Sequence, residues 1–347
     1  MKTLRVELRE RSYPVYIGRG AVFETAALLR AVSAAKRLAF ITDERIGSEY
    51  APALLHLLRE AGFEPYLLTV SAGEEAKTMP QYAALMEKLT ALGLQRSDAI
   101  LALGGGTVGD LAGFAAATLC RGVDYIVLPT TLLSQTDSAI GGKNALNTAA
   151  GKNLVGTFYQ PKLVLIDPNF LDTLPLREKN SGMAEVIKYA LIGDAEMFAL
   201  LESCDAYRFP LESVIYRCCA MKAAFVAADE LDHGARRALN FGHTFGHAYE
   251  RAYHYGAYTH GEAVAAGMVR MLRVQGADAL AERLTALLGK YDLPAEIDCL
   301  PETLAAGIRA DKKNVGDMLT VVEVPEAGTF SLRETTVEQL VYGGEDT

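Results

Sequence analysis

Residues 100–117 read ILALGGGTVGDLAGFAAA, and this stretch decides the fold class. An apolar run typical of a buried strand leads into a glycine-rich turn, and an alanine-rich helical run follows. The glycines fit G-x-G-x-x-G at Gly104, Gly106 and Gly109. Bare glycines let a phosphate approach the backbone, and the helix N-terminus supplies N–H donors. The motif alone is weak, because a tight turn with positive φ also selects glycine.

Short β-rich runs surround this stretch, and helical runs separate them. They are RLAFITD at 37–43, PYLLTV at 65–70, YIVLPT at 125–130 and LVLID at 163–167. Alternation of this kind predicts a Rossmann-like α/β domain, a parallel sheet covered on both faces with ligands at the carboxyl ends of its strands. The glycine turn follows about the fourth strand, and the best ribose-binding acid, Asp43, lies upstream of it. A dinucleotide site here would therefore be a variant of the usual Rossmann arrangement.

The second half of the chain reads as helical. Alanine- and leucine-rich segments replace the strands, and a short β-like run at 319–334 follows them. The expected helical segments are 182–203, 211–229, 237–251, 261–275 and 278–289. We therefore predict two domains with a boundary near Pro175: an α/β domain over 1–175 and a mainly α-helical, metal-binding domain over 176–347.

Composition excludes several classes of protein. The net charge of −9 comes with no dense basic stretch, so we expect no nucleic-acid partner. No apolar run approaches the ~18 residues of a membrane span, and the N-terminal residues alternate in polarity like a strand rather than a signal peptide. We expect a cytoplasmic protein. The five cysteines form no CxxC pair, which argues against a disulfide framework or a zinc ribbon.

A long polar segment at 129–161 reads PTTLLSQTDSAIGGKNALNTAAGKNLVGTFYQP. It carries Asp137, Lys143, Lys152 and Asn153 among glycines, serines and threonines. Loops of this length are usually functional, and lysines beside backbone N–H groups suit a phosphate. We predict a phosphate-binding loop, with a solvated surface loop as the alternative.

Three of the six histidines lie close together in the sequence. NFGHTFGHAYE at 240–250 places His243 and His247 on one helix face, and His260 begins a small-residue run. Glu185 and Lys188 share a face in SGMAEVIKYALIG at 181–193, which alone would suit a surface ion pair. Two histidines and one glutamate make a three-ligand catalytic zinc shell with an open position. Spacing leaves open which two histidines take part.

Together these segments resemble the 3-dehydroquinate synthase family over nearly the whole chain. The resemblance also includes GEEAK at 73–77, CRGVDY at 120–125 and RRALN at 236–240, in order. It implies that Glu185, His243 and His260 hold zinc or cobalt. His247 would instead face the substrate, as a donor near the phosphate and a proton relay.

The resemblance also implies the remaining contacts. An arginine in the position of Arg121 would reach the neighbouring subunit's site, which implies a homodimer. Contacts to NAD would come from Asp43, Glu74, Lys77, Gly105, Gly106, Gly109, Asp110, Thr130, Thr131, Lys143, Lys152 and Thr173. Contacts to the substrate would come from Asp137, Lys143, Asn153, Lys188, Lys222, Arg236, Asn240, His247 and Lys312.

The implied reaction starts from 3-deoxy-D-arabino-heptulosonate 7-phosphate, a sugar phosphate that also carries a carboxylate. Transient oxidation by bound NAD, loss of phosphate, return of the hydride and an intramolecular aldol closure would give 3-dehydroquinate. Three alternatives stay open: a metal-dependent alcohol or glycerol dehydrogenase of the same fold, another sugar-phosphate cyclase, and a non-catalytic NAD-binding protein.

Overall fold

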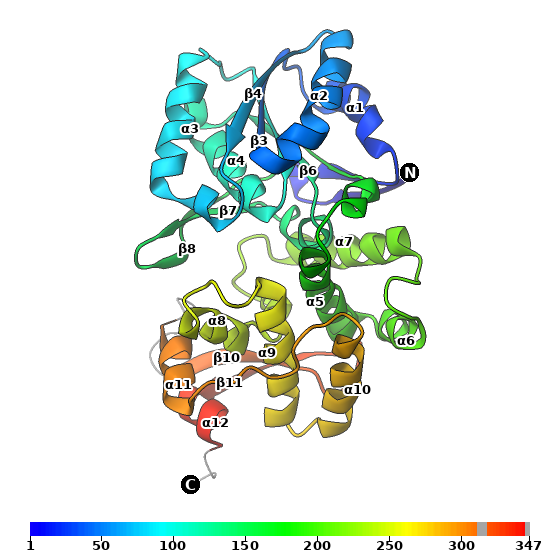
Figure 1. Cartoon of the computed structure of the whole chain (residues 1–347), viewed down its shortest axis with the longest axis vertical. Coiled ribbons are helices and arrows are strands. Elements are labelled where there is room, and N and C mark those ends of the chain that lie inside the picture. The colour runs from blue at the N-terminus through cyan, green and yellow to red at the C-terminus, as the bar shows by residue number, and fades with distance from the viewer. Residues whose placement is uncertain (311–317, 344–347) are drawn as a thin grey trace. The chain divides into compact units, whose positions relative to one another are not determined.

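The computed structural model describes residues 1–310 and 318–343, and its chain divides into two compact units (Figure 1). Unit 1 comprises Met1–Leu174 together with Ile215–Leu231. Unit 2 comprises Pro175–Val214 and Asp232–Thr347. The two units are therefore not separated by a single boundary near Pro175. Residues 215–231, from the second half of the chain, pack with unit 1.

Unit 1 is built on a seven-stranded sheet in the order β1-β2-β9-β6-β5-β3-β4. Neighbours are parallel except for the antiparallel pair β1 and β2. Its strands are β1 (Lys2–Val6), β2 (Tyr13–Ile17), β3 (Arg37–Asp43), β4 (Glu64–Val70), β5 (Ala99–Gly104), β6 (Asp124–Pro129) and β9 (Leu163–Ile166). The predicted parallel sheet is confirmed. The glycine turn follows the fifth strand in chain order, because the N-terminal segment supplies two strands.

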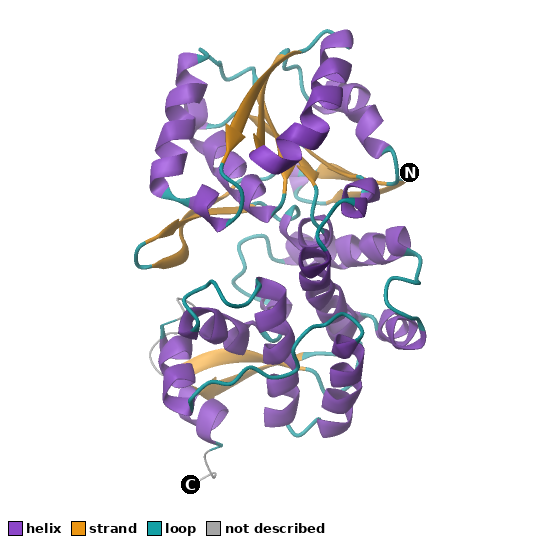
Figure 2. Ribbon diagram, in the orientation of Figure 1, coloured by secondary structure: helices purple, strands orange, loops and turns teal. Residues whose placement is uncertain are grey.

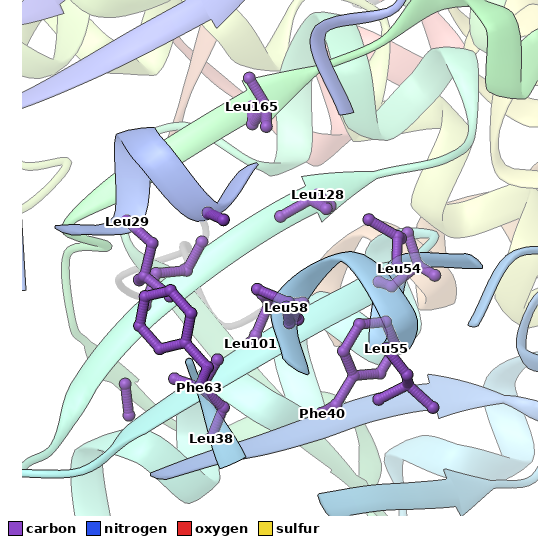
Figure 3. Close-up of a cluster of buried hydrophobic side chains, with 14 of the residues drawn as sticks. Leu29, Leu38, Phe40, Leu54, Leu55, Leu58, Phe63, Leu101, Leu128 and Leu165 are labelled. Atoms are coloured by element: carbon purple, nitrogen blue, oxygen red, sulfur yellow. The ribbon is translucent and has the colours of Figure 1, made fainter. Parts of the chain in front are cut away.

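Helices cover both faces of this sheet, as Figure 2 shows. They are α1 (Thr25–Val32), α2 (Glu44–Glu60), α3 (Met79–Ala91) and α4 (Gly106–Thr118). A further helix, α7 (Leu211–Ala228), has most of its length in unit 1. Figure 3 shows Phe40 and Leu101 of the sheet beside Leu58 of α2. The alternate residues of β3, such as Ile41, are equally buried on the opposite face. Burial on both faces is why the central strands read as continuous apolar runs.

The polar segment 129–161 is not a single loop, so that prediction was wrong in its local structure. It contains a π-helical turn, Ser134–Ser138, and an antiparallel hairpin of β7 (Lys143–Thr148) and β8 (Gly151–Phe158). Most of β8 is exposed or half-buried, so its sequence lacks the apolar alternation that normally reveals a strand.

Unit 2 consists of helices around a small hairpin. The hairpin pairs β10 (Met318–Glu323) with β11 (Ser331–Thr336), as the β-like run predicted. The helices are α5 (Leu176–Gly193), α6 (Ala195–Ser203), α8 (His243–Ala252), α9 (His260–Val274), α10 (Asp278–Gly289), α11 (Pro301–Arg309) and α12 (Val337–Tyr342). Within the described ranges, no helix has both the length and the apolar character that crossing a bilayer requires.

Two predicted helical segments are interrupted in unit 2. The segment 182–203 breaks at Asp194, whose non-helical backbone ends α5 and whose side chain accepts from Met197 N at 2.9 Å to cap α6. The segment 237–251 begins as a 3₁₀-helix, Ala235–Asn240, and breaks at Gly242, which has φ 76°. This second break makes His243 the first residue of α8.

Candidate active site

The glycine turn in unit 1 connects β5 directly to α4. Gly104, Gly105, Gly106 and Gly109 all lie outside the positive-φ region, so a left-handed turn is not the reason for these glycines. At Gly104 and Gly106 the reason is that a side chain would not fit. A Cβ on Gly104 would lie 2.7 Å from the Val108 side chain, and one on Gly106 would lie 3.0 Å from Ser138 Oγ. The turn therefore has bare, buried or half-buried backbone at the N-terminus of α4, which suits a phosphate.

Several predicted cofactor residues lie at the same edge of the sheet. Asp43 ends β3, which pairs with β5, and Thr130 N donates to Gly104 O at 2.9 Å. Asp43 Oδ1 also caps α2 by accepting from Arg45 N and Ile46 N. The parallel sheet brings these groups together because the carboxyl ends of its strands share one edge.

Two threonines stand beside these groups. Thr131 Oγ1 lies 2.8 Å from Ser134 Oγ, which belongs to the π-helical turn. Thr173 joins α2 through two contacts: its carbonyl accepts from Arg45, and its hydroxyl lies 2.7 Å from the Tyr50 hydroxyl.

A small pocket opens at this turn, and its lining includes the four glycines, Asp110, Ser138 and Lys143. Two buried hydroxyl oxygens in this region, Thr130 Oγ1 and Ser138 Oγ, have no hydrogen-bond partner among the described residues. Bare backbone, a helix N-terminus and two hydroxyls fit the phosphates and ribose of a dinucleotide. Sequence reasoning missed Ser138, and the only signal for it was its place beside Asp137.

A buried lysine connects three of the predicted ligand-binding segments. Lys77 is 5% exposed, and its Nζ donates to Asp110 Oδ2 at 2.5 Å and to Asn153 Oδ1 at 2.8 Å. Burial raises the pKa of Asp110, and the Lys77 ammonium opposes that rise. Glu74 accepts from Asn147 in β7 at 2.7 Å. The partly buried Lys152 precedes Asn153 in β8.

A second ion pair links the π-helical turn to α7. Lys222 Nζ lies 2.8 Å from Asp137 Oδ1, and Lys222 is 7% exposed. Two predicted substrate residues are therefore brought together within unit 1. Arg121 lies apart from them: it is exposed after the end of α4 and has φ 64°.

In unit 2, three helices bring Glu185, His243 and His260 together. Nε2 of His243 lies 3.4 Å from Glu185 Oε1, and Nε2 of His260 lies 3.5 Å from the same oxygen. Their ligand atoms all lie within 4.8 Å of one another. Glu185 is 1% exposed and neither carboxylate oxygen has an aligned hydrogen-bond donor among the described residues. Two imidazoles and one carboxylate aimed at one point fit a divalent zinc- or cobalt-type ion.

Lys188 contacts the other oxygen of Glu185, and both side chains are 1% exposed. The alternative of a surface ion pair is therefore wrong. The Lys188 cation and the neighbouring His243 outweigh burial and hold the pKa of Glu185 well below its usual range. Glu185 is thus an anion at neutral pH, as a metal ligand must be.

Glycines let these helices approach closely enough for the ligands to meet. A Cβ on Gly246 of α8 would lie 3.2 Å from Val264 Cα of α9. A Cβ on Gly267 would overlap the carbonyl oxygen of Gly242, and one on Gly261 would overlap Ser181 of α5. Gly242 and Gly261 flank the two histidines directly, so close backbone packing positions both imidazoles.

The two imidazoles differ in their second contact. Nδ1 of His243 lies 3.1 Å from the carbonyl oxygen of Phe241, and burial lowers the pKa of His243 to about 4. This ring is neutral, with a proton on Nδ1 and a lone pair on Nε2, since a carbonyl only accepts. Nδ1 of His260 faces Glu250 at 3.3 Å. Burial lowers the pKa of His260, but the carboxylates of Glu250 and Glu185 outweigh it and raise the pKa to about 10.

The remaining predicted residues of unit 2 are His247, Arg236, Asn240 and Lys312. The His247 ring centroid lies 5.4 Å from that of His243 and 6.1 Å from that of His260. Arg236 is 1% exposed on the 3₁₀-helix, and Asn240 at its end donates to Arg237 O at 3.0 Å. Lys312 lies outside the described residues.

Comparison with known proteins relates both halves of the chain to one family. The family model described as 3-dehydroquinate synthase N-terminal matches residues 67–181, and the model described as 3-dehydroquinate synthase C-terminal matches residues 182–314. The 3-dehydroquinate synthase of Clostridium beijerinckii is 43% identical over 97% of this chain and 99% of its own.

Solved structures of related enzymes have the same fold. A 2-epi-5-epi-valiolone synthase from Streptomyces hygroscopicus subsp. jinggangensis 5008, with NAD⁺ and Zn²⁺ bound, has a TM-score of 0.87 at 28% identity and covers 97% of this chain and 96% of its own. A 2-deoxy-scyllo-inosose synthase complexed with carbaglucose-6-phosphate, NAD⁺ and Co²⁺ has a TM-score of 0.85 at 25% identity, covering 98% and 100%.

Proposed function

The chain belongs to the 3-dehydroquinate synthase family, and we propose how its residues divide the work of that reaction. It converts 3-deoxy-D-arabino-heptulosonate 7-phosphate into 3-dehydroquinate and phosphate, as an NAD- and divalent-metal-dependent lyase. The observation that best supports the site is the convergence of the Glu185 carboxylate with Nε2 of both His243 and His260.

The three ligands are Glu185, His243 and His260, holding zinc or cobalt. A bound divalent cation supplies Lewis acidity that lowers the pKa of substrate hydroxyls, and bound NAD supplies a reversible hydride acceptor. Lys188 keeps Glu185 anionic and its own ammonium close to the metal ligands. We assign its cation a second role beside an anionic group of the substrate.

The nucleotide-binding residues lie in unit 1. Gly105, Gly106 and Gly109 present backbone at the start of α4, and Thr130 and Thr131 follow the neighbouring strand β6. The edge of this site is formed by Asp43, Glu74, Lys77, Asp110, Lys143, Lys152 and Thr173. We assign residues 1–175 to nucleotide binding and residues 176–347 to metal and substrate binding.

The substrate carries a phosphate and a carboxylate, and a protein of net charge −9 must neutralise them locally. Arg236 offers a guanidinium fork, which binds carboxylate or phosphate through two hydrogen bonds. The amides of Asn153 and Asn240 donate to hydroxyl or phosphate oxygens. The other proposed cations are Lys143, Lys188, Lys222 and Lys312, and Asp137 holds Lys222 in place.

His247 is the proposed proton carrier. It stands on the same helix face as His243, beside the Glu185 cluster but outside its set of donor atoms, which supports a role in contact with the substrate. A histidine that donates near the leaving phosphate and then accepts a proton from a sugar hydroxyl suits elimination and ring opening.

Two features of the biological setting complete the proposal. The exposed Arg121 supports a homodimer in which it reaches the neighbouring subunit's site. None of the five cysteines, all of them among the described residues, forms a disulfide, which supports a reducing, cytoplasmic location.

The test is phosphate release from 3-deoxy-D-arabino-heptulosonate 7-phosphate with catalytic NAD and zinc, while absorbance at 340 nm is followed. We expect phosphate in proportion to substrate, no net NADH, and loss of turnover with EDTA. Steady accumulation of NADH would indicate a dehydrogenase instead. Turnover of glucose 6-phosphate or sedoheptulose 7-phosphate alone would indicate one of the sister cyclases. Glu185→Gln serves as the inactive control protein.

A further inference from the structure

We propose that Glu250 is a positioning residue for the metal ligand His260. Its carboxylate accepts the Nδ1–H of that imidazole and so aims Nε2 at the point shared with Glu185 and His243. This inference rests on the metal centre of the proposed function and assigns a role to a residue outside its ligand set.

The geometry of α8 carries the proposal. His243, His247 and Glu250 stand at positions i, i+4 and i+7, which places all three on one helix face. Glu250 is 5% exposed, and its Oε2 lies 3.3 Å from Nδ1 of His260. Nε2 of the same ring lies 3.5 Å from Glu185 Oε1. Because the Glu250 carboxylate holds Nδ1 of His260, Nε2 is the ring nitrogen that faces Glu185.

His243 provides an internal comparison. Its Nδ1 lies 3.1 Å from the carbonyl oxygen of Phe241, and its Nε2 lies 3.4 Å from Glu185 Oε1. Both imidazoles thus pair Nδ1 with an acceptor and turn Nε2 inward. The acceptor for His243 is main chain and no substitution removes it. The acceptor for His260 is a side chain, so its contribution can be measured.

The local sequence explains why His260 needs a side-chain partner. It is the first residue of α9, and the preceding Thr259 forms a capping box with Glu262. Thr259 N donates to Glu262 Oε2 at 2.8 Å, so the nearest acid in sequence is already engaged, and Arg177 binds its carboxylate as well. Glu250 reaches His260 from the neighbouring helix, where close packing of α8 and α9 brings it.

A rival role for Glu250 is that of a metal ligand. His247, Glu250 and His260 also offer donor atoms within 4.8 Å of one another. In that set His260 would bind the metal through Nδ1, the nitrogen that faces Glu250. Glu185 instead lies beside Nε2 of both His243 and His260. We favour the positioning role because partners of this kind are the rule for metal-bound histidines, and their loss costs about 10- to 100-fold in metal affinity.

The experiment measures Co²⁺ and Zn²⁺ affinity of the full-length apoprotein by competition with a chromophoric chelator. The variants are Glu250→Ala and Glu250→Gln, with Glu262→Gln as the matched control that removes a carboxylate two residues from His260. Circular dichroism and thermal melting of each apoprotein show whether it folds. The visible spectrum of bound Co²⁺ reports the coordination independently of turnover.

We expect Glu250→Ala to weaken metal affinity about 10- to 100-fold. Glu250→Gln should lose less, because its amide oxygen can still accept. Both should bind one equivalent at saturation with the wild-type Co²⁺ spectrum, and Glu262→Gln should keep wild-type affinity. Unchanged affinity in a folded Glu250→Ala protein would overturn the proposal. So would a changed Co²⁺ spectrum, which would make Glu250 a ligand. Normal metal binding by Glu185→Gln would instead contradict the proposed metal site, and this result can be told apart from a failure of the Glu250 proposal.

Discussion

Glu185 Oε1 lies 3.4 Å from Nε2 of His243, although the two residues belong to different helices and both are largely buried. At this distance a carboxylate oxygen and the lone pair of a neutral imidazole face each other. Such a pair is stabilised best when a cation binds both.

Glu185→Gln should abolish stoichiometric metal binding and turnover together. It also leaves the Lys188 ammonium buried without its anion, and breaking a buried pair in this way costs roughly 3–5 kcal/mol. The variant should therefore unfold at lower denaturant concentration. Metal content by atomic absorption and a urea titration check both expectations. Full metal occupancy in the purified variant would contradict them.

His247→Ala should keep the metal but lose turnover, by about 10²- to 10⁴-fold if the imidazole moves a proton in the reaction. The reason is that His247 lies outside the Glu185 cluster while remaining beside it. The measurement is kcat for phosphate release in protein whose zinc content has been determined. Loss of zinc in parallel with activity would show that His247 is a ligand.

Lys77→Ala should weaken NAD binding and make stability depend on pH. Burial already raises the pKa of Asp110, and removing the Lys77 ammonium raises it further. A carboxyl group with a raised folded-state pKa binds more protons folded than unfolded. Stability is thus retained below the ordinary pKa of about 4 and falls as pH rises toward the folded value.

The matched variant is Lys77→Ala with Asp110→Asn, which removes the buried charge as well. Denaturation at pH 5 and pH 7.5 should show a larger deficit for the single variant at the higher pH. The double variant should show little dependence on pH. Equal deficits of the single variant at both pH values would contradict the assignment of the effect to Asp110.

Ser138→Ala should weaken NAD affinity about 2- to 10-fold, the loss of one ordinary hydrogen bond. Its Oγ is buried beside Gly106 and lacks a partner among the residues that the structure describes. Calorimetric titration of NAD into the metal-loaded protein measures the effect. Ser134→Ala is a poor control because Ser134 bonds Thr131, so Thr136→Val, whose hydroxyl bonds Leu132 O, is preferable. Unchanged affinity in Ser138→Ala would exclude the hydroxyl from the site.

Some parts of the fold follow directly from local sequence. The strands around Phe40 and Leu101 are buried on both faces, so their central residues, 38–41 and 99–103, are all apolar and the pattern is clear. The hairpin of β7 and β8 escaped prediction because one strand is largely exposed and carries glycine and asparagine. The break at Asp194 escaped it because a helix cap and an ordinary polar residue in a helix look alike without coordinates.

By itself, the sequence determined the chemistry that this chain can perform. It placed a glycine turn after a buried strand and supplied imidazoles, a carboxylate and lysines in segments that resemble one family. Only the tertiary structure decided which of these groups meet. His243 and His260 lie beside Glu185, and Glu250 lies behind His260, because Gly242, Gly246 and Gly267 let α8 and α9 pack backbone to backbone. This convergence depends on the distances between helices, and the spacing of residues along one helix does not predict those distances.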